Sequence, residues 1–171
     1  ALALGLMDKG HKVTLSATED FKDFIEGFGV AFQPLWGNAE TMMNSKEGQS
    51  ILQTENSIKL MKYYFKVLHD NRVPLRKSYY EAISKADFII ANSMTLPIIS
   101  AIAEKQNKKV ALTYFMPPVV PTTEFPLGDF DFFNFPWYNK LTYKIAQGFF
   151  WKFIKEDTKE YRKELGLPEL K

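Results

Sequence analysis

Apolar residues change their spacing several times along this chain, and the changes predict alternating helices and strands. The first half is predicted to contain, in order, a helix over 1–9, a strand over 12–16, a helix over 21–28, a strand over 30–35, a loop with a helical turn over 36–49, and helices over 51–68 and 72–85. The second half is predicted to contain a strand over 86–91, a helix over 95–106, a strand over 109–114, an irregular segment over 115–137, and a helix from about 138 into the 160s.

Two of these helices show an amphipathic pattern most clearly. The helix over 21–28 follows a sequence at 16–19 that has the form of a capping box, with Thr18 as the rival cap. Its apolar residues recur at helical spacing and are Phe21, Phe24, Ile25 and Phe28. The apolar row of the last helix consists of Leu141, Ile145, Phe149 and Phe153.

The order of the elements indicates the fold class. A helix, a glycine turn at Gly10 and a strand in quick succession are half of a βαβ unit. A helix that opens a parallel α/β domain normally follows a strand, and here we expect that strand to be missing. We therefore predict an α/β fold, a Rossmann-like doubly wound parallel sheet that lacks its first strand. Residues 1–171 are expected to form a single incomplete domain.

Composition supports a globular domain and excludes several kinds of site. The 171 residues are 46% hydrophobic, and the net charge of +2 gives little reason to expect nucleic acid as a partner. The chain has no cysteine, which excludes disulfides, thiolate metal sites and a cysteine nucleophile. Its two histidines, His11 and His69, are too few for a histidine-rich metal cluster. No apolar run reaches the length of a membrane-spanning helix.

The carboxyl ends of the predicted strands are where a ligand would bind, because open parallel sheets bind ligands there. Four such ends lie at 16–18, 35–37, 92–94 and 115–117. The aromatic and proline-rich segment 115–137 has three interpretations. It could form an apolar pocket, cover edges of the core, or, as a weaker alternative, touch a membrane surface. Asn92 and Ser93 could hydrogen-bond a ligand, but the same pair is equally common as a helix cap.

Several sequence motifs are absent. No glycine-rich dinucleotide fingerprint follows a strand, and the chain has no P-loop, no nucleophile elbow and no HExxH zinc motif. His11 lies at a tight turn away from the predicted strand ends, so a structural role is favoured. His69 lies near the end of a long helix and has no obvious carboxylate partner in the sequence.

Residues 2–15, Leu-Ala-Leu-Gly-Leu-Met-Asp-Lys-Gly-His-Lys-Val-Thr-Leu, resemble the first helix and second strand of GT-B glycosyltransferases of the UDP-glycosyltransferase type. The nearest branch comprises bacterial and fungal enzymes that glycosylate sterols, other lipids, and glycopeptide or macrolide aglycones. The resemblance continues through 18–26, 29–35, 114–121 and 162–168, whereas 38–85 is weakly matched. The match therefore runs from one end of the chain to the other.

The resemblance implies two facing Rossmann-like domains. The N-terminal domain binds the acceptor, and the C-terminal domain, which we expect this chain to lack, binds most of the nucleotide sugar. It also implies an inverting transfer that needs no metal or cofactor. A base near the end of the first strand deprotonates the acceptor hydroxyl, which attacks the anomeric carbon. We expect that strand and its loop to be absent, so the catalytic residue is unknown. Some branches have an acidic residue supporting a base His where this chain has Asn92, which favours an Asp base.

Our main hypothesis is the acceptor-binding domain of a hexosyltransferase that moves a sugar from a nucleotide sugar to a hydroxyl of a lipid, sterol or natural-product aglycone. The residues expected to contact the acceptor are Trp36, Asn92, Ser93, Phe115, Met116 and Pro117. The alternative is a non-catalytic Rossmann-like module that binds a small ligand or a protein. We expect a cytoplasmic protein, leave peripheral contact with the inner membrane face open, and expect this chain alone to be inactive.

Overall fold

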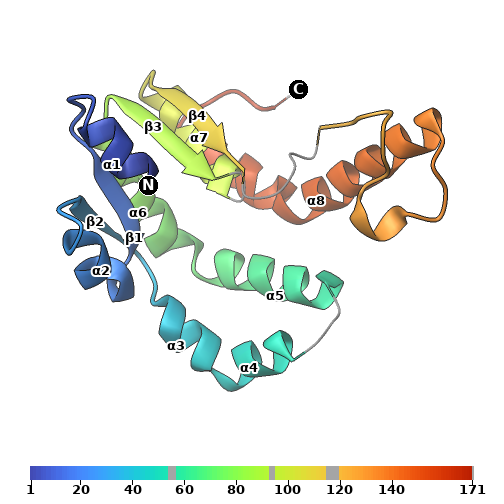
Figure 1. The fold of residues 1–171 in the computed structure, drawn as a ribbon, viewed down its shortest axis with the longest axis horizontal. Helices are drawn as coiled ribbons and strands as arrows, with labels where there is room; N and C mark the ends of the chain where they lie inside the picture. The colour runs from blue at the N-terminus through green and yellow to red at the C-terminus, as the bar shows by residue number, and fades with distance from the viewer. Residues whose placement is uncertain (54–56, 93–94, 115–119, 171) are drawn as a thin grey trace. The chain divides into compact units, whose positions relative to one another are not determined.

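A computed structural model describes the chain except for residues 54–56, 93–94, 115–119 and 171 (Figure 1). The chain divides into two compact units, Ala1–Asp87 and Phe88–Lys171. Each unit contains one pair of parallel strands joined through a helix, which is the arrangement that the alternating apolar pattern predicts. The predicted α/β class with parallel strands is therefore confirmed.

The first unit contains a strand–helix–strand arrangement after its opening helix. Helix α1 (Leu2–Met7) precedes strand β1 (Thr14–Thr18), and a 3-10 helix (Glu19–Phe21) leads into α2 (Lys22–Glu26) and strand β2 (Ala31–Leu35). β1 and β2 run parallel, with Thr14 opposite Ala31 and Thr18 opposite Leu35 (Figure 1). The turn after α2 requires Gly29, whose φ of +71° lies in the left-handed region.

One prediction for this segment was wrong, and one apolar pattern did not lead to burial. The capping box over 16–19 does not form, because Ser16 lies inside β1, and Thr18 takes the N-cap position of the 3-10 helix without a side-chain hydrogen bond. The apolar row of α2 is mostly exposed, since only Ile25 of that row is buried. Phe24 and Phe28 instead make an edge-on ring contact at 5.2 Å on the outside. The helical spacing was read correctly, but the segment forms barely one and a half turns.

The rest of the first unit is helical. It contains α3 (Ala39–Asn44), α4 (Lys46–Leu52), α5 (Ser57–Asp70) and α6 (Arg72–Ser84). The prediction of a loop with a helical turn over 36–49 gave too little helix, because two side chains start helices there. Asn38 Oδ1 accepts from the Thr41 backbone N–H at 2.7 Å, and Ser45 Oγ accepts from Gly48 at 3.0 Å. α6 packs on β2, and the core of the unit consists of Ile25, Val30, Phe65, Leu75 and Ile83.

The second unit repeats the parallel strand pair. Strand β3 (Phe88–Asn92), helix α7 (Leu96–Lys105) and strand β4 (Lys109–Thr113) follow in order, with Phe88 opposite Lys109 and Asn92 opposite Thr113. A 3-10 turn (Gly128–Phe130) then precedes the long helix α8 (Pro136–Glu164). The boundaries of α7 and α8 agree with the predicted ranges. β3 alternates in burial, however, and is not covered on both faces, since Phe88 and Ile90 are exposed.

α7 provides most of the core of the second unit. Its buried residues are Ile99, Ala101, Ile102 and Ala103, and the helix contacts β3, β4 and α8. Arg162 of α8 is buried and binds α7 through a bidentate ion pair with Glu104, in which the two N–H···O distances are 2.7 and 3.0 Å. Arg162 Nε also donates to the Pro168 carbonyl at 2.9 Å. One guanidinium therefore fastens α7, α8 and the C-terminal segment together.

Candidate functional site

The carboxyl ends of β1 and β2 meet at one edge of the first unit, where a ligand is expected. Trp36 follows β2 directly, and its backbone N–H donates to Ser78 Oγ of α6 at 3.0 Å. A Cβ at Gly37, whose φ is +118°, would lie only 3.4 Å from the Thr18 side chain, so the two strand ends approach closely. The Trp36 side chain is 38% exposed at this edge. It is thus held by its backbone while part of the indole is open.

Asp20 is a residue at this edge that sequence reasoning did not single out. Its two carboxylate oxygens accept from the backbone N–H groups of Ala39 and Glu40, at 3.2 and 3.3 Å. A hydrogen bond from the Thr18 side chain is the largest influence that lowers the pKa of Asp20, and the bonds from Ala39 and Glu40 act in the same direction. Asp20 therefore ties the loop after β1 to the start of α3, which makes it an organising residue for the loops around Trp36.

In the second unit, Asn92 ends β3 and is hydrogen-bonded to Thr95, the N-cap residue of α7. Asn92 Oδ1 accepts from the Thr95 backbone N–H at 3.3 Å, and Thr95 Oγ1 donates to the Asn92 carbonyl at 3.1 Å. Thr113, which is opposite Asn92 in the register, donates from Oγ1 to the Ala91 carbonyl at 3.2 Å. These hydrogen bonds support the capping interpretation of Asn92, and a contact with a ligand stays a prediction.

The other predicted contact residues, Ser93, Phe115, Met116 and Pro117, lie outside the described residues, and their roles stay predictions. Trp36 belongs to the first unit and Asn92 to the second, and each is placed within its own unit. Across 1–53, 57–92, 95–114 and 120–170, no group of three His, Asp or Glu residues is arranged to hold a metal ion. Within the same ranges, no helix combines the length and apolar character needed to cross a membrane.

His11 occupies the turn after α1, as predicted. Its backbone N–H donates to the Leu6 carbonyl at 3.1 Å, and Gly10 beside it has a φ of +86°. These contacts belong to the end of a helix and lie at the start of β1, whereas Trp36 and Asp20 lie beyond strand ends. The geometry thus agrees with a structural role for His11.

Sequence comparison places this chain among known proteins. No family model matches it. It is 28% identical over 177 residues to a sterol 3-beta-glucosyltransferase of Candida albicans and 27% identical over 179 residues to one of Komagataella phaffii, covering 99% of this chain in both cases. A sterol 3-beta-glucosyltransferase of Arabidopsis thaliana is 28% identical over 96% of the chain. The chain spans 11%, 14% and 26%, respectively, of the length of these curated relatives. The resemblance to glycosyltransferases is thereby confirmed.

Proposed function

We propose, given that this chain is a relative of the UDP-glycosyltransferase-type enzymes, that it forms the acceptor-binding part of a hexosyltransferase. The whole protein would transfer a hexose from a nucleotide sugar to the hydroxyl of a hydrophobic acceptor, and a sterol is the acceptor that we favour. The observation that carries this proposal is the extent of the similarity, because 96% or more of the chain aligns with sterol glucosyltransferases from fungi and a plant.

The proposed reaction is an inverting displacement without a metal ion. A general base takes the proton of the acceptor hydroxyl, and the hydroxyl oxygen forms a bond to the anomeric carbon as the bond from that carbon to the nucleotide diphosphate breaks. The nucleotide leaves with the electron pair of the broken bond. The contribution of this chain is to hold the hydroxyl close to the donor, which makes the encounter effectively intramolecular.

The proposed acceptor contacts are Trp36, Asn92, Ser93, Phe115, Met116 and Pro117. Trp36 supports this proposal best, since its indole is partly open beside the paired ends of β1 and β2. An exposed aromatic ring suits an apolar, rigid acceptor such as a sterol. Asn92 would act mainly by fixing the start of α7, and so the position of the residues after β3.

The test is a transfer assay with the full-length protein. UDP-glucose and other nucleotide sugars are offered with a sterol, a glycerolipid and a polyketide aglycone, and the products are identified by mass spectrometry and by the anomeric coupling in their NMR spectra. We expect a β-linked product from an α-linked donor, with the sterol as the best acceptor, and full activity in the presence of a chelator. Absence of transfer from every nucleotide sugar would instead favour a non-catalytic binding module.

A further inference from the structure

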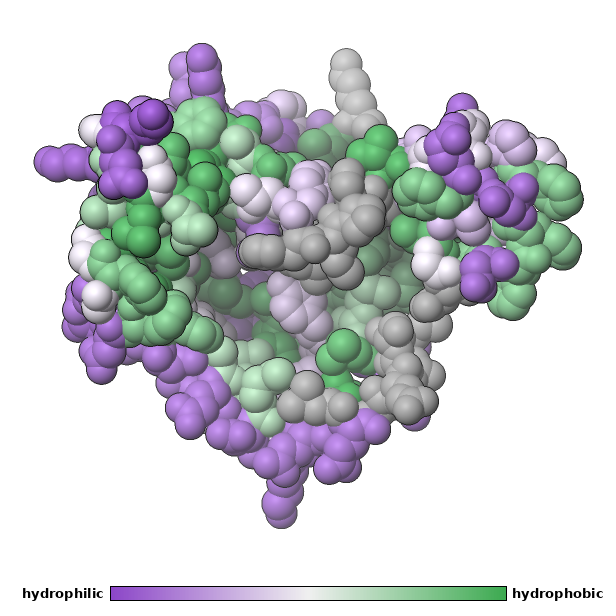
Figure 2. Space-filling view, in the orientation of Figure 1, coloured by the Kyte–Doolittle hydropathy of each residue, from purple (hydrophilic) through white to green (hydrophobic). Residues whose placement is uncertain are grey.

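Trp36 is distinguished from other exposed apolar residues of the first unit by the way its backbone is held. Hydrophobic side chains appear at several places on the surface of this unit, at the left of Figure 2, and Phe24 and Phe28 of α2 are more exposed than Trp36. Exposure alone therefore does not identify a binding residue. The chain around Trp36, however, is fixed by side chains from α6, from the end of β1 and from the 3-10 helix that follows β1. A ring on a backbone fixed in this way suits the selective binding of a rigid ligand.

Ser78 of α6 holds the backbone of Trp36 through a hydroxyl that is itself fixed. Its Oγ accepts from the Trp36 N–H at 3.0 Å and donates to the Leu75 carbonyl, one turn earlier in α6, at 2.9 Å. The second bond uses the only proton of the hydroxyl, so the helix sets the position of the oxygen that accepts from Trp36. Since α6 packs on β2, Trp36 is attached to a core helix that lies 42 residues farther along the chain.

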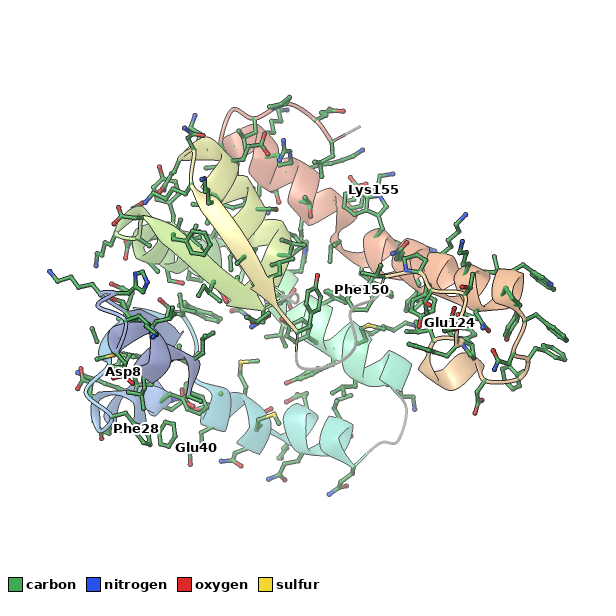
Figure 3. The ribbon with its side chains drawn as sticks, turned by 45° about the horizontal axis from the view of Figure 1, so that its top comes forward. Asp8, Phe28, Glu40, Glu124, Phe150 and Lys155 are labelled. Atoms are coloured by element: carbon green, nitrogen blue, oxygen red, sulfur yellow. The ribbon has the colours of Figure 1, made fainter. Side chains whose placement is uncertain are left out.

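The loop after the tryptophan is fixed as well. Gly37 has a φ of +118°, and a Cβ there would lie 3.4 Å from the Thr18 side chain, so this turn has little room. The Thr18 side chain hydrogen-bonds to the carboxylate of Asp20. The two oxygens of that carboxylate accept from the backbone N–H groups of Ala39 and Glu40, and Figure 3 labels Glu40 at this start of α3. The chain is thus held on both sides of the indole.

A fixed backbone limits what the Trp36 indole can do while its ring stays partly open. The backbone dihedral angles restrict the side-chain rotamers, so the ring occupies a narrow range of positions. Such a ring loses little conformational entropy when a ligand covers it. A flat, rigid ring system needs the indole in one place, whereas a flexible chain adapts to the surface that it meets. The gain from fixing the indole is therefore larger for a rigid ligand.

We infer that Ser78 and Asp20 are positioning residues that, through Trp36, make the site selective for rigid, fused-ring acceptors. This inference rests on the proposed function, in which the acceptor lies against Trp36. Both residues act through the main chain, because their oxygens bond to the backbone N–H groups of Trp36, Ala39 and Glu40. Hydrogen bonds to the Asp20 carboxylate favour its charged form and make it a poor proton acceptor, so we assign it no role as a general base.

The first experiment measures steady-state transfer by the full-length protein from UDP-glucose to two dissolved acceptors, a sterol and a flexible long-chain alcohol. Ser78→Ala should raise the sterol KM about fivefold, raise the alcohol KM by less than about twofold, and leave kcat and the donor KM unchanged. Asp20→Ala should act in the same direction. Ser78→Thr keeps the hydroxyl and should restore the sterol KM. The matched control is Ser100→Ala in the second unit, where Ser100 Oγ donates to the Pro97 carbonyl at 3.3 Å, and it should behave like the wild type.

A double-mutant cycle tests whether Ser78 acts through Trp36. In a Trp36→Ala background, Ser78→Ala should change the sterol KM by less than about twofold, because the ring that it positions is gone. Additive effects of the two substitutions would overturn the inference. Equal losses with the sterol and the flexible alcohol, or a fall in kcat for both acceptors with unchanged KM values, would assign Ser78 a purely structural role and overturn it as well.

Fluorine NMR of the full-length protein labelled with fluorotryptophan separates this inference from the proposed function. The resonance of Trp36 is assigned by its loss in Trp36→Phe. Ser78→Ala should shift or broaden this resonance and weaken the Kd for the dissolved sterol about fivefold, and Ser78→Thr should restore both. If these changes occur but no acceptor is glucosylated, the transferase proposal fails and the selectivity of the Trp36 site for rigid ligands stands. If transfer occurs but Ser78→Ala changes neither the resonance nor the sterol KM, the inference fails and the proposed function stands.

Discussion

The two parallel strand pairs are built alike but protected differently. β1–α2–β2 and β3–α7–β4 each contain two five-residue strands in parallel register around one helix. α7 has ten residues and buries Ile99, Ala101, Ile102 and Ala103, whereas α2 has five residues and buries Ile25. The same supersecondary unit thus gives a closed core in one case and a half-open one in the other.

Both helices have enough apolar residues to form a core. The difference in burial therefore arises from the elements that cover each helix. α7 packs between its strands and α8, where Arg162 holds Glu104. α2 contacts its strands and the adjoining 3-10 helix, and Phe24 and Phe28 are exposed. A crossover helix with apolar residues on two sides therefore buries both sides only where a second layer of structure covers it.

The sharpest test of this comparison is truncation of the buried isoleucine in each helix. Ile102→Ala should cost about 4 kcal/mol and Ile25→Ala about 2 kcal/mol, because the fully enclosed site cannot collapse or admit water as easily. Native-state hydrogen exchange, resolved for the amides of each strand pair, measures the two losses separately. Equal losses would mean that α2 is as well covered as α7.

The next largest effect concerns the clamp on α7. Arg162→Met removes three hydrogen bonds of a buried guanidinium and should cost about 2 kcal/mol. Glu104→Gln should cost at least as much, because it leaves the Arg162 guanidinium, whose side chain is only 6% exposed, without a carboxylate partner, whereas Arg162→Met leaves the 47% exposed Glu104 side chain open to water. Urea unfolding of the two variants gives both values. A clearly smaller loss for Glu104→Gln would show that the buried guanidinium does not need the carboxylate of Glu104.

A smaller effect should appear in the first unit at low pH. Since the folded-state pKa of Asp20 lies below its ordinary value of 3.8, its contribution to stability is present above that pH and is lost as the pH falls through the folded value. Asp20→Asn should therefore be less stable than the wild type at neutral pH and approach it in acid. The control is Asp8→Asn, which changes an exposed carboxylate after α1, labelled in Figure 3. A constant difference between Asp20→Asn and wild type across the acid range would contradict the hydrogen-bond assignment.

The elements that were predicted well have a strong apolar periodicity or a glycine at the end of the helix. The 29-residue α8 and the ten-residue α7 agree with their predicted ranges, and the glycine turn expected at Gly10 follows α1. β1 lies two residues later than predicted, because Ala17 and Thr18 pair with β2 instead of starting a helix. Local propensity alone could not reveal this pairing, since the partner strand lies 17 residues away.

The candidate site was harder to predict for a physical reason. The role of Asp20 depends on the backbone of Ala39 and Glu40, and nothing in the local sequence indicates a contact across 19 or 20 residues. The outward direction of Leu141 and Ile145 was equally hidden, because periodicity identifies an apolar row but not what covers it. Trp36 was selected correctly as a residue beyond a strand end, and its contact with an acceptor stays a prediction.

The most direct test of the central claim is a steady-state comparison of the full-length enzyme with its Trp36→Ala and Trp36→Phe variants, using a nucleotide sugar and a dissolved sterol. If this chain forms the acceptor-binding half, Trp36→Ala raises the acceptor KM about tenfold, which corresponds to about 1.4 kcal/mol, leaves the donor KM unchanged, and is largely rescued by Trp36→Phe. Equal increases in the two KM values, or an increase for the donor alone, would contradict the account.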